Sequence, residues 1–285
     1  MTANNEPSRT ALTAAAARAA HLIVDDQPLI FNDHLAATLL GEQADALISY
    51  HRLHGSHVVL AGARGQVTCR SRYTEDQLAR AVRDGVTQYV ILGAGLDTFT
   101  HRSPLAGLLR VFEADHPATQ DWKRGQLAAA SLPEPAGVTY VPTDLEAPDV
   151  TTSLVSSGLD PARPAFVSWL GVTMYLTRGA IAQTLGSLGH LAPGSELVTD
   201  YMLPPGLRDA DGSAYADQVM PFAAERGEPW LSFFTPGEMS ELLTGHGFAA
   251  PAHIRQRDAI SPALWQRKDA LRPIDLSVLA HAVIH

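Results

Sequence analysis

The chain has 285 residues, of which 46% are hydrophobic and 18% are charged, and its formal net charge at pH 7 is -9. This composition is enough for one large buried core, and it excludes a disordered, collagen-like or coiled-coil chain. The excess of acidic residues argues against a protein whose main task is to neutralise nucleic-acid phosphates, because that task needs clustered lysine and arginine.

The cysteine content and the amino-terminal residues predict a cytoplasmic protein. The single cysteine, Cys69, cannot form an internal disulfide and has no second cysteine for a zinc site or a redox pair. Residues 1–10 lack the basic and apolar regions of a signal peptide, and Arg18 and His21 interrupt the apolar stretch that follows. We therefore expect neither a membrane nor a nucleic acid as a partner.

The first part of the chain, residues 10–86, carries helical patterns. Residues 1–9 are polar, and we expect them to form a disordered tail. Thr10 is a candidate N-cap for an alanine-rich helix. Residues 74–77 match the capping box of a later helix, which Gly85 would end. These helices are expected to form a helical cover ahead of the main domain.

From residue 87 to residue 285, short apolar runs alternate with helical patterns. Such alternation is typical of a doubly wound α/β fold with a mostly parallel sheet. Seven strands are predicted, at residues 89–92, 111–112, 138–141, 166–167, 197–199, 252–256 and 278–284. Thr177 and Thr235 are predicted to cap two of the helices. Residues 202–232 are rich in proline, glycine and aspartate and show no clear period, which predicts an insertion or lid after the fifth strand.

Two glycines, Gly93 and Gly95, directly follow the first predicted strand. Glycines at this place let the backbone approach a ligand at the carboxyl edge of the sheet, where doubly wound folds bind their ligands. A dinucleotide-binding fold would need glycine or alanine where Thr98 stands, and Asp97 would place a negative charge beside a pyrophosphate. The pattern therefore favours a cofactor without phosphate, such as S-adenosylmethionine, over NAD.

Acidic residues end the second and third predicted strands. Asp115 stands twenty residues after Gly95, where a carboxylate can accept hydrogen bonds from both ribose hydroxyls. Asp144 is placed to accept a hydrogen bond from the adenine amino group, while the N–H of Leu145 donates to a ring nitrogen. Each aspartate alone could equally be a loop cap, but two of them after successive strands favour a nucleoside site.

Four segments together resemble the bacterial branch of the leucine carboxyl methyltransferase family. They are RSRYTEDQL (70–78), QYVILGAGLDTFTHR (88–102), VFEADHPATQDWKR (111–124) and FVSWLGVTMYLT (166–177). The resemblance extends over about residues 20–285 and implies a class I S-adenosylmethionine-dependent methyltransferase with a Rossmann-like domain over 87–285. It also implies that Arg72 binds the methionine carboxylate of the cofactor, with a salt bridge on the helix surface as the alternative, and that the Gly93 carbonyl accepts its amino group. Asp115, Asp144 and Leu145 would hold the ribose and the adenine.

The resemblance also suggests which residues face the methyl acceptor. Tyr175 matches the tyrosine that faces the substrate in the family, and a half-buried packing role is the alternative. His116 is a candidate base, or else a hydrogen-bonding group at the strand end. The glutamate and the substrate-binding arginine of the protein-carboxyl methyltransferases correspond here to Leu170 and Glu146, which disfavours a carboxylate substrate.

The sequence thus predicts methyl transfer from S-adenosylmethionine to a carboxylate or hydroxyl oxygen of a small molecule, such as a secondary metabolite. A carboxylate acceptor needs no base, whereas a hydroxyl does. No metal is expected, because the cluster of His51, His54 and His57 has no acidic or cysteine partner beside it. A non-catalytic cofactor-binding module and an NAD-dependent reductase are the alternatives.

Overall fold

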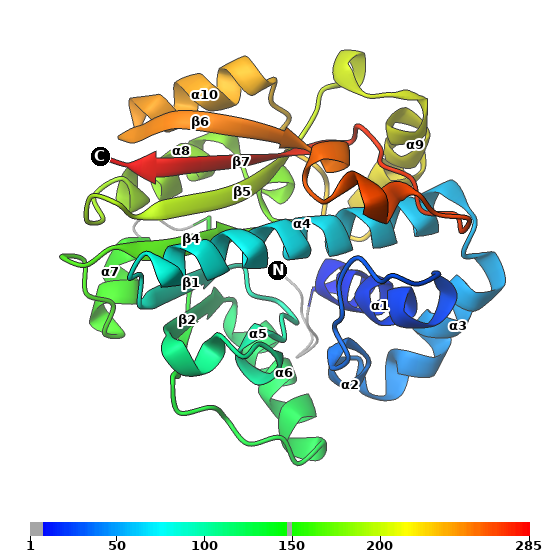
Figure 1. The fold of residues 1–285 in the computed structure, drawn as a ribbon, viewed down its shortest axis with the longest axis horizontal. Helices are drawn as coiled ribbons and strands as arrows, with labels where there is room; N and C mark the ends of the chain where they lie inside the picture. The colour runs from blue at the N-terminus through cyan, green and yellow to red at the C-terminus, as the bar shows by residue number, and fades with distance from the viewer. Residues whose placement is uncertain (1–7, 147–149) are drawn as a thin grey trace.

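A seven-stranded, mostly parallel sheet lies at the centre of the fold (Figure 1). The computed structural model describes residues 8–146 and 150–285. The strand order is β3-β2-β1-β4-β5-β7-β6, and β7 runs antiparallel to both of its neighbours. The strands are β1 (Gln88–Leu92), β2 (Arg110–Asp115), β3 (Val138–Pro142), β4 (Ala165–Trp169), β5 (Glu196–Met202), β6 (Phe248–Arg255) and β7 (Ser277–Ile284). All seven predicted strands are confirmed, with their ends shifted by a few residues.

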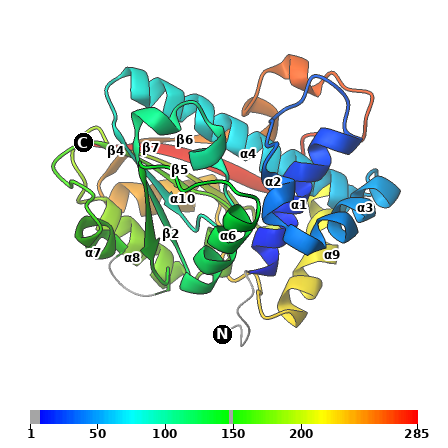
Figure 2. The ribbon, with the colours of Figure 1, turned by 90° about the horizontal axis from the view of Figure 1, so that it is seen from below.

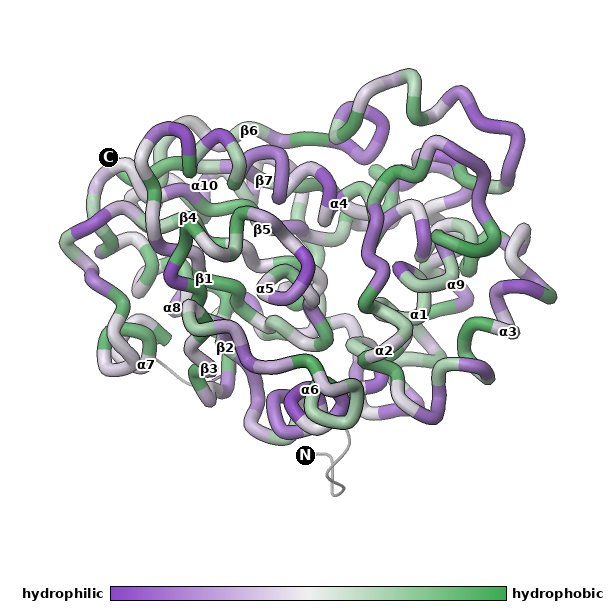
Figure 3. Tube along the Cα trace, turned by 60° about the horizontal axis from the view of Figure 1, so that its bottom comes forward, coloured by the Kyte–Doolittle hydropathy of each residue, from purple (hydrophilic) through white to green (hydrophobic). Residues whose placement is uncertain are grey.

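Helices pack on both faces of this sheet, and further helices form the cover at one end of the molecule. They are α1 (Arg9–Val24), α2 (Ala36–Leu39), α3 (Ala44–His54), α4 (Val58–Arg83), α5 (Phe99–Arg102), α6 (Pro117–Ala129), α7 (Val150–Ser156), α8 (Arg178–Leu188), α9 (Ala210–Glu225) and α10 (Pro236–Gly245). Alternate residues of β1 point to opposite faces, so that Val90 packs with α7, α8 and α10 and Tyr89 packs with α4 and α5. In Figure 3 the tube beside the β1 label is green, the colour of hydrophobic residues.

Helix α1 begins earlier than the sequence predicts. The predicted tail ends in residues 8 and 9, and the structure places both in or at the helix: Ser8 is the N-cap and Arg9 the first helical residue. The Ser8 hydroxyl accepts a hydrogen bond from the N–H of Ala11, which leaves Thr10 free to make contacts elsewhere. The prediction of Thr10 as the cap was therefore wrong, and the rest of the predicted tail, residues 1–7, lies outside the described residues.

Helix α4 is a single 26-residue helix, and the capping box predicted at residues 74–77 was wrong. Thr74 is buried in its middle, 1% exposed, rather than at its start. The helix continues through this position because an unbroken buried stripe, which includes Val67, Leu78 and Ala81, packs against the rest of the protein. The start of α4 is His57, whose side chain accepts a hydrogen bond from the N–H of Val59.

The segment predicted as an insertion without a period contains a helix, α9. Asp209 caps it by accepting a hydrogen bond from the N–H of Gly212 at 2.7 Å. Pro221 lies inside the helix, and this proline disrupts the helical pattern that a sequence would otherwise show. Figure 2 shows α9 at the same end of the molecule as α1 and α3, so this segment joins the helical cover.

A buried ion pair joins the helices of the cover. The Arg64 guanidinium binds both carboxylate oxygens of Asp25, at 2.8 and 2.9 Å, and Asp25 also bonds to His21 Nδ1 at 2.8 Å. Arg64 Nη1 lies 3.2 Å from His51 Nδ1. Burial and the Arg64 charge lower the pKa of His51 to about 4, so this imidazole is neutral.

The sequence predicts neither a membrane partner nor a metal site, and the described residues can be searched for features of both. Among them, no helix is long and apolar enough to cross a membrane. No group of three or more histidine, cysteine, aspartate or glutamate side chains in these residues is placed to hold a metal ion. Of the three clustered histidines, His51 belongs to the buried pair network and His57 caps α4.

Candidate active site

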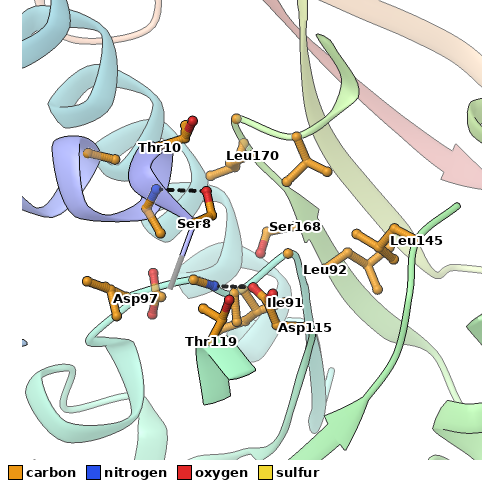
Figure 4. A pocket seen from close by; sticks show the side chains of 18 of the residues that line it. Ser8, Thr10, Ile91, Leu92, Asp97, Asp115, Thr119, Leu145, Ser168 and Leu170 are labelled. Carbon is orange, nitrogen blue, oxygen red and sulfur yellow. Dashed lines mark hydrogen bonds between the residues drawn. The ribbon is translucent and has the colours of Figure 1, made fainter. Parts of the chain in front are cut away.

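A pocket of about 270 Å³ opens at the carboxyl ends of β1, β2 and β4. Helices α1 and α4 cover it from the side of the helical cover. Figure 4 shows Asp115 from the end of β2, Leu170 from the end of β4 and Thr10 from α1 around the same space. The pocket therefore occupies the edge at which doubly wound sheets bind ligands.

Seven of the eight site residues predicted from the sequence line this pocket. They are Gly93, Gly95, Asp115, His116, Asp144, Leu145 and Tyr175. The eighth, Arg72, does not line it, whereas Arg70 of the same helix does. The structure thus brings together predicted residues that are up to 82 positions apart in the chain.

The loop after β1 forms the floor of the pocket. Gly93 has φ of +65°, and a Cβ at this position would overlap the Cγ2 methyl of Val172. A residue other than glycine would thus have a strained backbone conformation here, and its side chain would block access of a ligand to the end of β1. The N–H of Gly95 donates to Asp115 Oδ2 at 2.5 Å, which fixes the loop against the end of β2.

Asp115 is held in one orientation at the pocket wall. Its second oxygen, Oδ1, accepts a hydrogen bond from the N–H of His116 at 2.6 Å. Burial raises the pKa of the Asp115 carboxyl, although these two backbone donors oppose the shift. Each carboxylate oxygen keeps a further lone pair, so Asp115 can still accept hydrogen bonds from a ligand.

His116 serves as the N-cap of α6. Its Nδ1 accepts a hydrogen bond from the N–H of Ala118 at 3.3 Å, and the side chain is exposed at the rim of the pocket. This geometry matches the hydrogen-bonding alternative for His116.

Asp144 and Leu145 line the pocket after β3. Asp144 is exposed, and its Oδ1 accepts a hydrogen bond from the N–H of Glu146 at 2.9 Å, as in a loop cap. Leu145 is partly buried and packs against the core beside Val172. Residues 147–149, which follow, lie outside the described residues.

The structure corrects the assignment of Arg72. Residues two apart on a helix point about 200° away from each other, so Arg70 and Arg72 cannot face the same pocket. Arg72 has a 44% exposed side chain and bonds to Asp76 at 2.8 Å on the surface of α4. Arg70 has a 15% exposed side chain and lines the pocket.

A buried aspartate that the sequence analysis missed holds Arg70 in place. Arg70 Nη1 donates to Asp200 Oδ2 at 3.1 Å, and Asp200 Oδ1 accepts a hydrogen bond from the N–H of Gly171 at 2.6 Å. Asp200 lies in β5 and is 1% exposed. The signal that could have found it is an acidic residue in a strand that is otherwise apolar.

Acidic side chains line the part of the pocket between α4 and the β1 loop. Asp97 accepts a hydrogen bond at 2.7 Å from the N–H of Phe99, the first residue of the short helix α5. Glu75 pairs with Arg102, and burial raises the pKa of this glutamate despite the pair. These carboxylates and Arg70 give the pocket groups of both signs, which suits a ligand with both charged amino and carboxylate ends.

Tyr175 forms part of the opposite wall, in a short 3-10 helix after β4. Its hydroxyl lies 3.4 Å from Thr10 Oγ1, and Thr10 in turn binds Glu228. Burial raises the pKa of the Tyr175 phenol, so the group is protonated at neutral pH.

The two positions at which the sequence departs from the family also lie near this wall. Leu170 lines the pocket. Glu146 is exposed and accepts a hydrogen bond from the N–H of Thr177 at 3.2 Å, at the start of α8. Neither position supplies a cation.

Comparison with known proteins identifies the family. A family model described as leucine carboxyl methyltransferase matches residues 11–189. A Bacillus subtilis (strain 168) protein, YktD, described as a candidate S-adenosyl-L-methionine-dependent methyltransferase, is 34% identical over 301 residues and covers 98% of each chain. A protein of the same description from Mycolicibacterium paratuberculosis (strain ATCC BAA-968 / K-10) is 32% identical over 270 residues, covering 87% of this chain and 84% of its own.

Solved structures share the fold. A candidate methyltransferase from Thermobifida fusca YX has a TM-score of 0.61 at 18% identity and covers 99% of this chain and 96% of its own. A DUF574 family protein from Streptomyces avermitilis MA-4680 also has a TM-score of 0.61, at 16% identity, covering 95% and 97%. The predicted family, fold class and cofactor are thereby confirmed. The chain belongs to the leucine carboxyl methyltransferase family, has the class I methyltransferase fold and is an S-adenosylmethionine-dependent methyltransferase.

Proposed function

We propose that the protein transfers the methyl group of S-adenosylmethionine to an oxygen atom of a small molecule. The observation that carries this proposal is the closure of the acceptor side of the pocket. Thr10 of α1 reaches across to Glu228, 218 residues later in the chain, and both of its donors bind that carboxylate. This contact ties α1 to the segment after α9 beside the pocket, and a wall built in this way suits a small acceptor better than a protein surface.

The pocket residues fit the cofactor when they are assigned one by one. We propose that Asp115 binds the ribose hydroxyls and that Asp144 and the N–H of Leu145 bind the adenine. The Gly93 carbonyl would accept a hydrogen bond from the cofactor amino group. We assign the methionine carboxylate to Arg70, because its guanidinium lines the pocket and a guanidinium binds a carboxylate through two parallel hydrogen bonds.

The contribution of the protein to the reaction is alignment and the exclusion of water. The cofactor supplies an electrophilic methyl group on a sulfonium ion, and the acceptor oxygen must approach it in line with the bond that breaks. Tyr175 and Thr10 lie on the wall that the acceptor would contact, and α1 and α4 shield this space from solvent. Orientation by these residues is expected to provide most of the rate enhancement.

Two measurements test this function in sequence. Calorimetric titration of the dialysed protein with S-adenosylmethionine and with S-adenosylhomocysteine is expected to show micromolar binding, which corresponds to about -8 kcal/mol. Formation of S-adenosylhomocysteine is then followed with a set of small hydroxyl and carboxylic compounds. Cofactor binding without turnover of any compound would favour a non-catalytic binding module, and the absence of binding would contradict the proposal.

A further inference from the structure

Three residues from distant parts of the chain form a connected chain of hydrogen bonds at the acceptor wall. Tyr175 lies after β4, Thr10 in the first turn of α1, and Glu228 in the segment after α9. The Tyr175 hydroxyl lies 3.4 Å from Thr10 Oγ1, and both Thr10 Oγ1 and the Thr10 N–H bond to Glu228 Oε2. Catalytic hydrogen bonds in unliganded sites are often long and tighten when the substrate binds.

The backbone fixes the positions of these residues. The segment that carries Glu228 runs beside the 3-10 helix of Tyr175, because the N–H of Leu231 donates to the Met174 carbonyl at 2.6 Å. The Ser232 hydroxyl donates to the Leu176 carbonyl at 2.7 Å on the other side of Tyr175. The contact between Glu228 and Thr10 is therefore supported by hydrogen bonds to the main chain on both sides of the tyrosine.

The direction of the hydrogen bonds follows from the number of hydrogens. A carboxylate can only accept, so the single hydroxyl hydrogen of Thr10 points to Glu228. The hydrogen between Thr10 and Tyr175 must then come from Tyr175. The Tyr175 oxygen has two lone pairs: one faces the donor-only indole N–H of Trp230, and the other can accept a hydrogen bond from a molecule in the pocket, which this side chain lines.

We propose that Tyr175, Thr10 and Glu228 form a proton relay that removes the proton of a hydroxyl acceptor during methyl transfer. This inference rests on the proposed function and makes it more specific. The substrate class is a neutral hydroxyl compound, because a carboxylate acceptor has already lost its proton and needs no relay. Tyr175 is the catalytic residue, since it touches the acceptor, and Thr10 and Glu228 are positioning residues that act through it.

The step is balanced in atoms and charge. The acceptor oxygen forms a bond to the methyl carbon while the bond between that carbon and sulfur breaks, and the electron pair stays on sulfur. The acceptor proton passes to the Tyr175 oxygen, the Tyr175 proton passes to Thr10 Oγ1, and the Thr10 proton passes to Glu228. Glu228 is partly exposed, so its carboxylic acid can lose the proton to water.

The surroundings of Tyr175 favour a protonated phenol that passes a proton on, rather than a phenolate that exists before the reaction. The charged and titratable groups that face it are Arg70 from α4, Tyr215 from α9 and Glu228. Burial of the phenol, together with the Glu228 charge, outweighs the opposing effects of the hydrogen bonds with Thr10 and Trp230 and of the Arg70 charge, so the pKa of Tyr175 is raised. A phenol that stays protonated can pass a proton on only if a partner accepts its own, and Thr10 is that partner.

The test uses substituted phenols of increasing acidity, each paired with the benzoic acid that carries the same substituents. Product formation is measured for the wild type, Glu228→Gln, Thr10→Val and Tyr175→Phe. Glu228→Gln keeps an oxygen that accepts from Thr10 but removes the base, and Thr10→Val removes the hydroxyl but keeps the N–H. Thr10→Ser, which restores the hydroxyl, and Glu225→Gln, which changes an exposed acid at the end of α9, are the controls.

We expect the wild type to methylate the phenols and not the benzoic acids. Glu228→Gln and Thr10→Val are expected to lower kcat about 100-fold for the least acidic phenol, within the usual range for general acid–base catalysis. The loss should shrink as the phenol becomes more acidic or the pH rises, because the acceptor then loses its proton unaided. The Kd of S-adenosylhomocysteine should be unchanged in both variants. Thr10→Ser should restore the activity that Thr10→Val loses, and Glu225→Gln should behave as the wild type.

Three results would overturn the relay in a protein that binds S-adenosylhomocysteine. They are equal losses in Glu228→Gln for phenols of every acidity, faster methylation of the benzoic acids than of the phenols, and the absence of methylation of any phenol. Failure to bind S-adenosylmethionine and S-adenosylhomocysteine would instead contradict the proposed function itself, and the relay with it.

Discussion

The Arg70 guanidinium lies between a buried carboxylate and a glycine. Asp200 Oδ2 accepts its hydrogen bond at 3.1 Å, and a Cβ on Gly171 would overlap Arg70 Nη2. The guanidinium is thus fixed before any ligand binds, and less side-chain freedom has to be lost on binding. Its remaining donors are available for a carboxylate in the pocket.

Removal of this guanidinium should weaken binding of the amino-acid end of the cofactor. We expect Arg70→Ala to raise the Kd of S-adenosylhomocysteine about 10- to 100-fold, as for the loss of a charged hydrogen-bonded pair. The Kd of methylthioadenosine, which lacks the amino-acid end, should not change. Calorimetry on Arg70→Ala and on the control Arg72→Ala tests this, and a loss in the control equal to that in Arg70→Ala would refute the assignment.

The space beside Gly171 can be tested with a second glycine as control. Gly171 and Gly227 have φ of +72° and +79°, so alanine is strained at both positions and should cost about 1 kcal/mol of folding free energy at each. A Cβ on Gly227 would have no heavy atom of the described residues within 4 Å. Only Gly171→Ala should therefore weaken S-adenosylhomocysteine binding, and equal Kd values for the two variants would contradict a role for this contact.

At the scale of elements, the contact between α3 and α4 is built on a neutral histidine beside an arginine. His51 Nδ1 faces Arg64 Nη1, and Arg64 is held by Asp25. The imidazole is 6% exposed, so a proton on it would be both desolvated and repelled by Arg64. This packing makes the stability of the helical cover depend on pH.

The sign of this dependence follows from the pKa of His51, which is lowered from 6.5 to about 4 in the folded state. Between these values the unfolded state binds a proton that the folded state does not, so stability falls as the pH falls. We expect the wild type to lose roughly 2 kcal/mol more between pH 7 and pH 5 than His51→Asn, which keeps an acceptor but does not titrate. Urea denaturation at the two pH values measures this difference. Equal losses of stability in the wild type and His51→Asn would show that the pKa of His51 is not lowered in the folded state.

At the scale of the whole molecule, the pocket lies where the helical cover meets the sheet (Figure 2). A ligand in this pocket contacts α1 and α4 on one side and the ends of β1, β2 and β4 on the other. Ligand binding therefore raises the free energy of unfolding of the whole protein.

Thermal unfolding should report this coupling. At a concentration of 100 times Kd, S-adenosylhomocysteine is expected to add about 2.7 kcal/mol to stability, which raises Tm by several degrees. NADH should leave Tm unchanged, because Asp97 and Thr98 stand where a dinucleotide fold needs room for a pyrophosphate. A larger rise in Tm with NADH than with S-adenosylhomocysteine would contradict the assignment of the pocket.

The sheet and the pocket floor could be predicted from the sequence because their signals are local. Each strand is a short apolar run, and Gly93, Gly95 and Asp115 come directly after such runs. The choice between Arg70 and Arg72 could not be made, because a helical pattern that was expected to end before a new helix at Thr74 does not show which face of residues 70–72 meets the sheet. The contacts of Thr10 with Glu228 and of Arg70 with Asp200 span 218 and 130 residues, and no local pattern encodes them.

Because α4 extends through both parts, the helical cover and the sheet domain depend on the same helix and have to be kept together in evolution. One helix carries Arg64 for the cover, Arg70 for the pocket, and Leu78 and Ala81 for the core that packs on the sheet. A fragment that starts at residue 87 would uncover that core and lose the pocket arginine together. Recombination between relatives should therefore yield folded chimeras when the crossover lies outside α4. A one-residue insertion between Arg64 and Arg70 should turn the two parts of the helix about 100° relative to each other, so that the contacts of the cover and those of the pocket cannot form together.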